Sequence, residues 1–182
     1  AWVTHCIDRI KGDNAILVNE SPLQQEHLTL RDPGSFFSAS PVGGLGWGMG
    51  AALGLKLGAP DKLVIAAVGD GAYMFGNPTS AHFVSRALDL PVLTVIFNNQ
   101  MWGAVSRATK FMYPDGYAAK SNQVPLTLLD PSPDLELVVT ASGGYGVRVD
   151  DPTKLEAALA KARDVVLNEG RQAVVNVITQ GV

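Results

Sequence analysis

The chain has 182 residues, of which 47% are hydrophobic and 17% charged, and its formal net charge at pH 7 is −3. This balance indicates a single folded domain over residues 1–182, and it excludes a disordered chain. The acidic character, without a cluster of Lys and Arg, also argues against a surface that binds nucleic acid.

The N-terminal region carries the only cysteine, Cys6, which cannot form an internal disulfide bond. A buried, unreactive thiol and a cytoplasmic setting are therefore expected. The chain starts at Ala1 rather than at an initiator Met, and we expect it to be the C-terminal part of a larger polypeptide. The apolar stretch 42–55 is too short for a bilayer helix and ends at Lys56, so no membrane contact is expected.

Short apolar runs bounded by turn residues alternate along the chain with helical patterns. The predicted strands are 15–18, 63–68, 92–97, 145–149 and 173–178. The predicted helices are 22–30, 43–57, 78–89, 102–112, 134–142 and 152–169, and residues 113–133 are predicted to form a long loop. This order predicts an α/β fold, a three-layer sandwich in which a mainly parallel sheet of about five or six strands is flanked by helices.

Polar residues follow two of the predicted strands. Gly69-Asp70-Gly71 comes directly after strand 63–68, and Asn98-Asn99 comes directly after strand 92–97. Because parallel strands present their carboxyl ends at one edge of the sheet, Asp70 and Asn99 are expected there, where open α/β sheets bind ligands. A carboxylate and an amide oxygen suit a hard divalent cation that holds a phosphate. Read separately, each pair is also a common turn signal.

This pattern resembles the cofactor motif of thiamine-diphosphate enzymes, GDG followed by NN, in the group of benzoylformate decarboxylase, benzaldehyde lyase and acetolactate synthase. The resemblance implies the thiamine-diphosphate-binding fold. It also implies that Mg²⁺ is held against the diphosphate by Asp70, Asn99 and the main-chain carbonyl of Met101.

The resemblance extends to other parts of the cofactor site. In the glycine-rich run 42–54, it implies that the carbonyl of Gly43 binds the aminopyrimidine and that Leu45 props the cofactor into its bent shape. Amides that open the helix after the GDG motif would face the diphosphate, although Ala72 stands where many relatives have Ser. The cofactor-binding residues implied in this way are Gly43, Gly44, Leu45, Gly69, Asp70, Gly71, Ala72, Asn99, Met101, Trp102, Gly103 and Ala104.

The function that the resemblance implies is the diphosphate- and Mg²⁺-binding domain of an enzyme that decarboxylates or carboligates 2-oxo acids. The activating Glu of such enzymes is expected on a pyrimidine-binding domain, in the same or another chain. A site built between subunits implies a homo-oligomer, at least a dimer. The choice between decarboxylation and carboligation, and the substrate itself, stay open.

Two alternatives remain. One is a non-catalytic module of the same fold. The other is a nicotinamide-dependent oxidoreductase, because Gly46-x-Gly48-x-x-Ala51 fits the dinucleotide pattern, although no clean strand precedes it. Two further polar residues are expected to be unremarkable: Glu20 as a solvated strand-end carboxylate and His82 as a structural residue.

Overall fold

The computed structural model describes residues 1–20, 22–38, 42, 44–121 and 126–180, and its centre is one six-stranded sheet. All neighbouring strands run parallel, in the order β2-β1-β3-β4-β6-β5. The strands are β1 (Ala15–Glu20), β2 (Phe36–Ser38), β3 (Leu63–Gly69), β4 (Leu93–Asn98), β5 (Tyr145–Val149) and β6 (Ala173–Ile178). The predicted α/β class and parallel sheet are confirmed.

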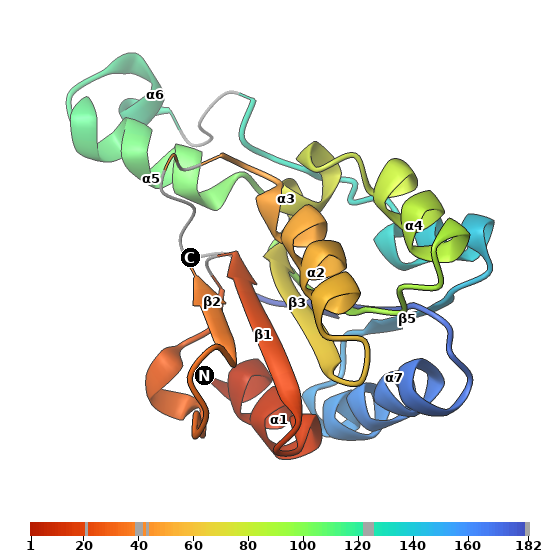
Figure 1. Cartoon of the computed structure of the whole chain (residues 1–182). Coiled ribbons are helices and arrows are strands. Elements are labelled where there is room, and N and C mark those ends of the chain that lie inside the picture. The colour runs from red at the N-terminus through yellow and green to blue at the C-terminus, as the bar shows by residue number, and fades with distance from the viewer. Residues whose placement is uncertain (21, 39–41, 43, 122–125, 181–182) are drawn as a thin grey trace.

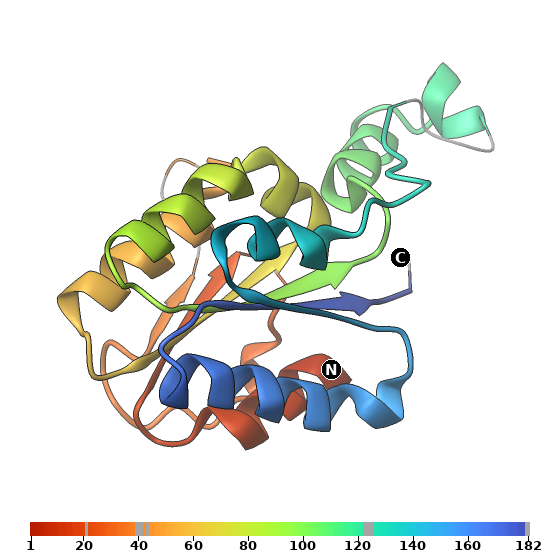
Figure 2. The same ribbon diagram turned by 90° about the vertical axis from the view of Figure 1, so that its right-hand side faces the viewer.

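Helices cover both faces of the sheet (Figures 1 and 2). One face carries α1 (Trp2–Lys11) and α7 (Leu155–Asn168). The other carries α2 (Trp47–Gly58), α3 (Asp70–Phe75), α4 (Pro78–Ala87) and the 3-10 helix η2 (Leu135–Ser142). The remaining helices α5 (Gly103–Met112) and α6 (Tyr117–Lys120) project as an arm from the edge where the strands end. Single 3-10 turns stand at η1 (Gln25–His27) and η3 (Pro152–Lys154).

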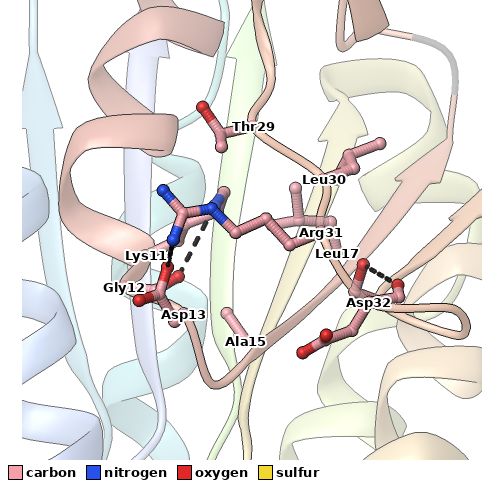
Figure 3. A pocket seen from close by; sticks show the side chains of 10 residues that line it. Lys11, Gly12, Asp13, Ala15, Leu17, Thr29, Leu30, Arg31 and Asp32 are labelled. Atoms are coloured by element: carbon pink, nitrogen blue, oxygen red, sulfur yellow. Dashed lines mark hydrogen bonds and ion pairs between the residues drawn. The ribbon is translucent and has the colours of Figure 1, made fainter.

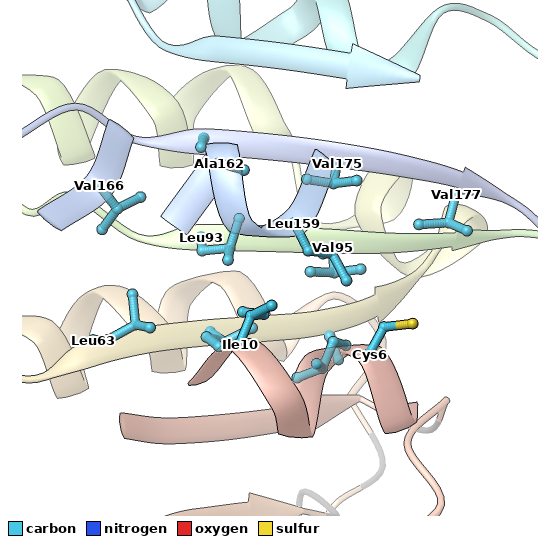
Figure 4. Close-up of a cluster of buried hydrophobic side chains, with 14 of the residues drawn as sticks. Cys6, Ile10, Leu63, Leu93, Val95, Leu159, Ala162, Val166, Val175 and Val177 are labelled. Atoms are coloured by element: carbon cyan, nitrogen blue, oxygen red, sulfur yellow. The ribbon is translucent and has the colours of Figure 1, made fainter. Parts of the chain in front are cut away.

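Two apolar layers form the core, one on each side of the sheet. The central strands are buried along nearly their whole length, because parallel strands with helices on both faces present no side to solvent. Figure 4 shows the layer between the sheet and the helices α1 and α7, where Leu93 and Val95 of β4 face Leu159 and Ala162 of α7. Cys6 lies in this layer and is fully buried, as predicted. Within the described residues, no helix is long and apolar enough to cross a bilayer.

Several predicted helices differ from the observed ones. The first helix, α1, is absent from the prediction because Val, Thr, His and Ile weaken its intrinsic helix preference; burial of Ile7 and Ile10 against the sheet stabilises it instead. Only one 3-10 turn forms within 22–30, whereas the helix predicted at 134–142 is present as the 3-10 helix η2. The predicted start of the second helix at Gly43 lies outside the described residues, and α2 begins at Trp47.

Candidate functional site

The carboxyl ends of β3 and β4 bring the two sequence motifs together. Asp70 is the first residue of α3, directly after β3, and Asn99 directly follows β4. One carboxylate oxygen of Asp70 and the amide oxygen of Asn99 both accept the backbone N–H of Met101, at 3.2 and 3.3 Å. The three residues predicted as metal ligands therefore lie in one cluster at the edge of the sheet.

This cluster borders the position in the sheet at which open α/β folds bind ligands. From β1 the chain passes outward to β2, whereas β3 lies on the opposite side of β1 and leads on to β4. The order of connections reverses between β1 and β3, and ligands bind in the crevice at such a switch point, beyond the carboxyl ends of the strands. Asp70 follows one of these two strands and Glu20 ends the other.

Asp70 is buried, with 3% of its surface exposed. Burial raises the pKa of its carboxyl group, and hydrogen bonds from the backbone N–H groups of Gly71 and Met101 offset part of that rise. None of the ion pairs in the described part of the chain involves this carboxylate. A buried carboxylate without a cationic partner is costly, so a bound cation would stabilise it.

The donor set at Asp70 fits a hard cation that takes its other ligands from elsewhere. No group of three or more His, Cys, Asp and Glu side chains that could hold a metal ion is present among the described residues. Asp70 and Asn99 supply two side-chain oxygens, and the carbonyl of Met101 accepts one hydrogen bond, from Gly103 at 2.8 Å, which leaves it a second lone pair. Such a partial oxygen set suits Mg²⁺, which keeps waters and binds phosphate oxygens.

Two glycines make the backbone around the cluster compact. A Cβ atom on Gly71 would lie 2.5 Å from the Trp102 ring, and one on Gly103 would lie 3.0 Å from the side-chain nitrogen of Asn99. The segment that carries Met101 and Trp102 is held by residues 127–129, because Trp102 donates its N–H to the Thr127 carbonyl and Met101 forms an antiparallel bridge. The ring of Trp102 therefore covers the start of α3.

The other predicted cofactor residues fall into two places. Gly69, Gly71 and Ala72 surround the start of α3, and Trp102, Gly103 and Ala104 surround the start of α5; these two helix starts are joined through Asp70 and Met101. Gly44 and Leu45 lie in the turn before α2, where 44% of Leu45 is exposed. Gly43 lies outside the described residues. Asn98, the first residue of the Asn pair, is fully buried and bonds Ser132.

Glu20 differs from the sequence prediction. It is a buried residue, not a solvated one, and its carboxylate accepts the backbone N–H groups of Gly46 at 2.5 Å and Gly48 at 2.9 Å. These amides belong to the start of α2. The first N–H groups of an α-helix have no partners inside the helix, so they need an acceptor from elsewhere. Glu20 thus supplies the negative charge that a helix N-terminus favours.

This contact removes the basis of the dinucleotide interpretation. In a dinucleotide site, the helix N-terminus and its glycine amides receive a pyrophosphate. Here the amides of Gly46 and Gly48 already bind the Glu20 carboxylate, which would repel an anion. The nicotinamide alternative is therefore not supported.

A separate hollow lies far from this cluster. Figure 3 shows it at the amino ends of β1 and β2, between the chain around Gly12 and the turn at Arg31, with an ion pair between Arg31 and Asp13. Asp70 and Asn99 stand at the opposite, carboxyl ends of the strands. The hollow therefore has no part in the candidate site.

A buried polar chain beneath α3 was not detectable from the sequence, since its members follow no spacing pattern. The Tyr73 hydroxyl and the Nε2 atom of His82 are 2.7 Å apart, and the Nδ1 atom of His82 is 2.7 Å from the Gln172 side-chain oxygen. Since that oxygen can only accept, Nδ1 carries the proton and Nε2 accepts from Tyr73. Burial lowers the pKa of His82, against the opposing effect of the Gln172 hydrogen bond. The structural role expected for His82 agrees with this arrangement.

We expect His82 to make folding sensitive to pH below about 6.5, the ordinary pKa of histidine. In that range the unfolded chain protonates His82 while the folded chain does not, so the unfolding free energy falls as pH falls, by up to about 1.4 kcal/mol per pH unit. Urea unfolding between pH 7.5 and 5.5 measures the slope. His82→Gln should flatten it, and the control His27→Gln, at an exposed site, should not. An unchanged slope in His82→Gln would show that other groups cause it.

Comparison with known proteins places this geometry in context. The family model described as thiamine pyrophosphate enzyme, C-terminal TPP binding domain, matches residues 21–177. The chain is 35% identical over 147 residues to the acetolactate synthase large subunit of Mycobacterium tuberculosis, covering 81% of this chain and 24% of that protein. It is 28% identical over 160 residues to the sulfoacetaldehyde acetyltransferase of Alcaligenes xylosoxydans xylosoxydans, covering 88% and 25%. The chain thus spans about a quarter of these relatives' length.

A solved structure has the same fold. The thiamine diphosphate-dependent 4-hydroxybenzoylformate decarboxylase of Rhodococcus jostii RHA1 superposes with a TM-score of 0.76 at 25% identity. The match covers 98% of this chain and 31% of that protein.

Proposed function

This chain belongs to the thiamine pyrophosphate enzymes, as their C-terminal TPP-binding domain, and from that premise we propose that it binds the diphosphate of the cofactor through Mg²⁺. The enzyme it serves acts on 2-oxo acids by decarboxylation or carboligation. The single observation that carries the metal assignment is the convergence of Asp70 and Asn99 on the N–H of Met101.

Asp70, Asn99 and the carbonyl of Met101 would hold the Mg²⁺ ion. The buried carboxylate of Asp70, which forms no ion pair with any described residue, supports this role, because a cation would compensate its charge. The diphosphate would lie against the backbone at Gly69, Gly71 and Ala72, where α3 starts, and beside Trp102, Gly103 and Ala104, where α5 starts.

The organic end of the cofactor would meet the loop before α2, through Gly43, Gly44 and Leu45. Leu45 is an apolar side chain with 44% of its surface exposed, which is consistent with a wedge that supports a ligand. When bound, thiamine diphosphate supplies an electron sink for the reaction of a 2-oxo acid. The residues of this chain bind and orient it, and Trp102 shields the start of α3 from water.

The activating Glu would come from a pyrimidine-binding domain, in the same or another chain. The projecting arm (Figure 2) and residues 126 and 128, which follow it in the chain, support a partner, because their large apolar side chains are exposed, and monomeric surfaces rarely gather so many. These side chains are Val105, Phe111, Met112, Tyr113, Tyr117, Leu126 and Leu128. We propose that the enzyme is a homo-oligomer, at least a dimer, with this chain as the C-terminal part of a larger polypeptide. A cytoplasmic location rests on the single cysteine alone.

Calorimetric titration of thiamine diphosphate into the full-length protein tests the proposal. We expect one site per chain in the presence of Mg²⁺ and loss of binding with EDTA, because the diphosphate reaches Asp70 only through the metal. No binding under either condition would overturn the proposal and favour a non-catalytic module. Release of CO₂ from 2-oxo acids then separates a catalytic protein from a cofactor-binding one.

A further inference from the structure

We infer that Glu20 is a positioning residue, which sets the loop before α2 for the organic half of the cofactor without contributing to the diphosphate site. The inference rests on the proposed function. It follows from the burial of Glu20, from the two amides that it binds, and from the separation of those contacts from the ones that hold Asp70.

The carboxylate of Glu20 joins the end of β1 to the start of α2. It is 6% exposed, and each of its oxygens accepts one backbone N–H, from Gly46 and from Gly48. Charge-assisted hydrogen bonds of this kind are shorter and stronger than neutral ones. A Cβ atom on Gly48 would lie 2.8 Å from the nearer carboxylate oxygen, so the absence of a side chain there is what allows the carboxylate to approach.

The same loop is fixed from its other side by the end of α3. Gly46 has a φ of 84°, and a Cβ atom on it would lie 2.5 Å from the Cα of Gly76, the residue that directly follows α3. The backbone at Gly46 is thus held between Glu20 and Gly76. Gly44 and Leu45 directly precede this fixed point, so its position decides where they lie.

The diphosphate site has its own supports. The carboxylate of Asp70 is held by the N–H groups of Gly71 and Met101, and both oxygens of Glu20 are engaged by the α2 loop. Asp70 starts α3 and Gly76 directly follows it, and the six residues of the helix span about 9 Å. A ligand confined to Asp70 would therefore not reach the loop, whereas a longer ligand would contact both.

The test compares two ligands in the full-length protein, with Mg²⁺ present throughout: thiamine diphosphate and inorganic pyrophosphate. In Glu20→Gln the side chain keeps its size but has only one acceptor oxygen. Its NH₂ group would face one of the two backbone N–H groups, of Gly46 or Gly48, and two donors cannot form a hydrogen bond. We expect the affinity for thiamine diphosphate to fall about ten-fold or more, and that for pyrophosphate to change by less than about two-fold. The matched control is Glu136→Gln, which alters an equally buried carboxylate that bonds Asn176.

The binding results distinguish the positioning role of Glu20 from the proposed function. Equal losses for both ligands, or no loss for either, would overturn the positioning role of Glu20. Failure of the unchanged protein to bind thiamine diphosphate would instead overturn the proposed function. If Glu20→Gln does not fold, as judged by its melting transition, Gly48→Ala disturbs the same contact from the helix side and should give the same selective loss.

Discussion

Replacing Asp70 with alanine is expected to abolish Mg²⁺-dependent binding of thiamine diphosphate, with a loss of affinity of about 100-fold or more. Asp70 carries the only carboxylate in the cluster with Asn99 and Met101, and the amide and carbonyl oxygens there are neutral. Without it, the Mg²⁺ ion loses the one negative charge that the cluster supplies. The cluster would then hold no Mg²⁺ ion to link the protein to the negatively charged diphosphate.

Calorimetry on the full-length protein measures this loss, and two further variants make it specific. Asp70→Asn keeps the size of the side chain and removes the charge, so it should also lose the metal dependence. Asp61→Ala changes an exposed carboxylate before the amino end of β3, the other end of the same strand, and should bind normally. Unchanged affinity in both Asp70 variants would contradict the metal assignment.

The sheet was predictable from the sequence because its central strands are continuous apolar runs bounded by turn residues. Continuous apolar runs such as 63–68 and 92–97 are typical of strands with helices on both faces, and they appear as β3 and β4 with parallel pairing. The helices were less predictable where tertiary contacts decide them. In α1, burial of Ile7 and Ile10 outweighs weak intrinsic preference.

The candidate site, too, was predictable from the sequence only in part. Asp70 and Asn99 were predictable because each directly follows an apolar strand, and parallel strands end at one edge. Their shared hydrogen bond to Met101 was not predictable, since it depends on how residues 127–129 hold that segment. Spacing places residues along the chain, but only the packed backbone decides which groups meet.

Glu20 shows why a carboxylate at a strand end cannot be assigned from the sequence. Exposed and buried positions look alike there, because burial depends on the loop that returns over the strand. That loop ends at Gly46 and continues into the first turn of α2 with Gly48, and the amides of both glycines bind Glu20. Of the glycines that suggested a dinucleotide site, Gly48 is instead the one whose missing side chain admits the Glu20 carboxylate.

Gly71→Ala is the second substitution for which we expect a large effect, because its Cβ atom would lie 2.5 Å from Cε3 and 2.7 Å from Cζ3 of Trp102. Inserting an atom into a packed contact costs about 1–3 kcal/mol. The ring or the first turn of α3 must shift, and a shift there moves Asp70 away from Met101. We expect the affinity for thiamine diphosphate with Mg²⁺ to fall about ten- to hundred-fold.

A second substitution tests whether Trp102 is the cause. Trp102→Phe removes the part of the indole that contains Cε3 and Cζ3, so the double variant with Gly71→Ala should regain much of the lost affinity. The control Gly54→Ala places a Cβ atom where nothing lies within 4 Å, and should bind as the unchanged protein does. If the double variant binds no better than Gly71→Ala alone, the contact with Trp102 does not explain the loss. Recovery of the affinity in the double variant would instead show that Gly71 is required because the Trp102 ring lies against the backbone at the start of α3.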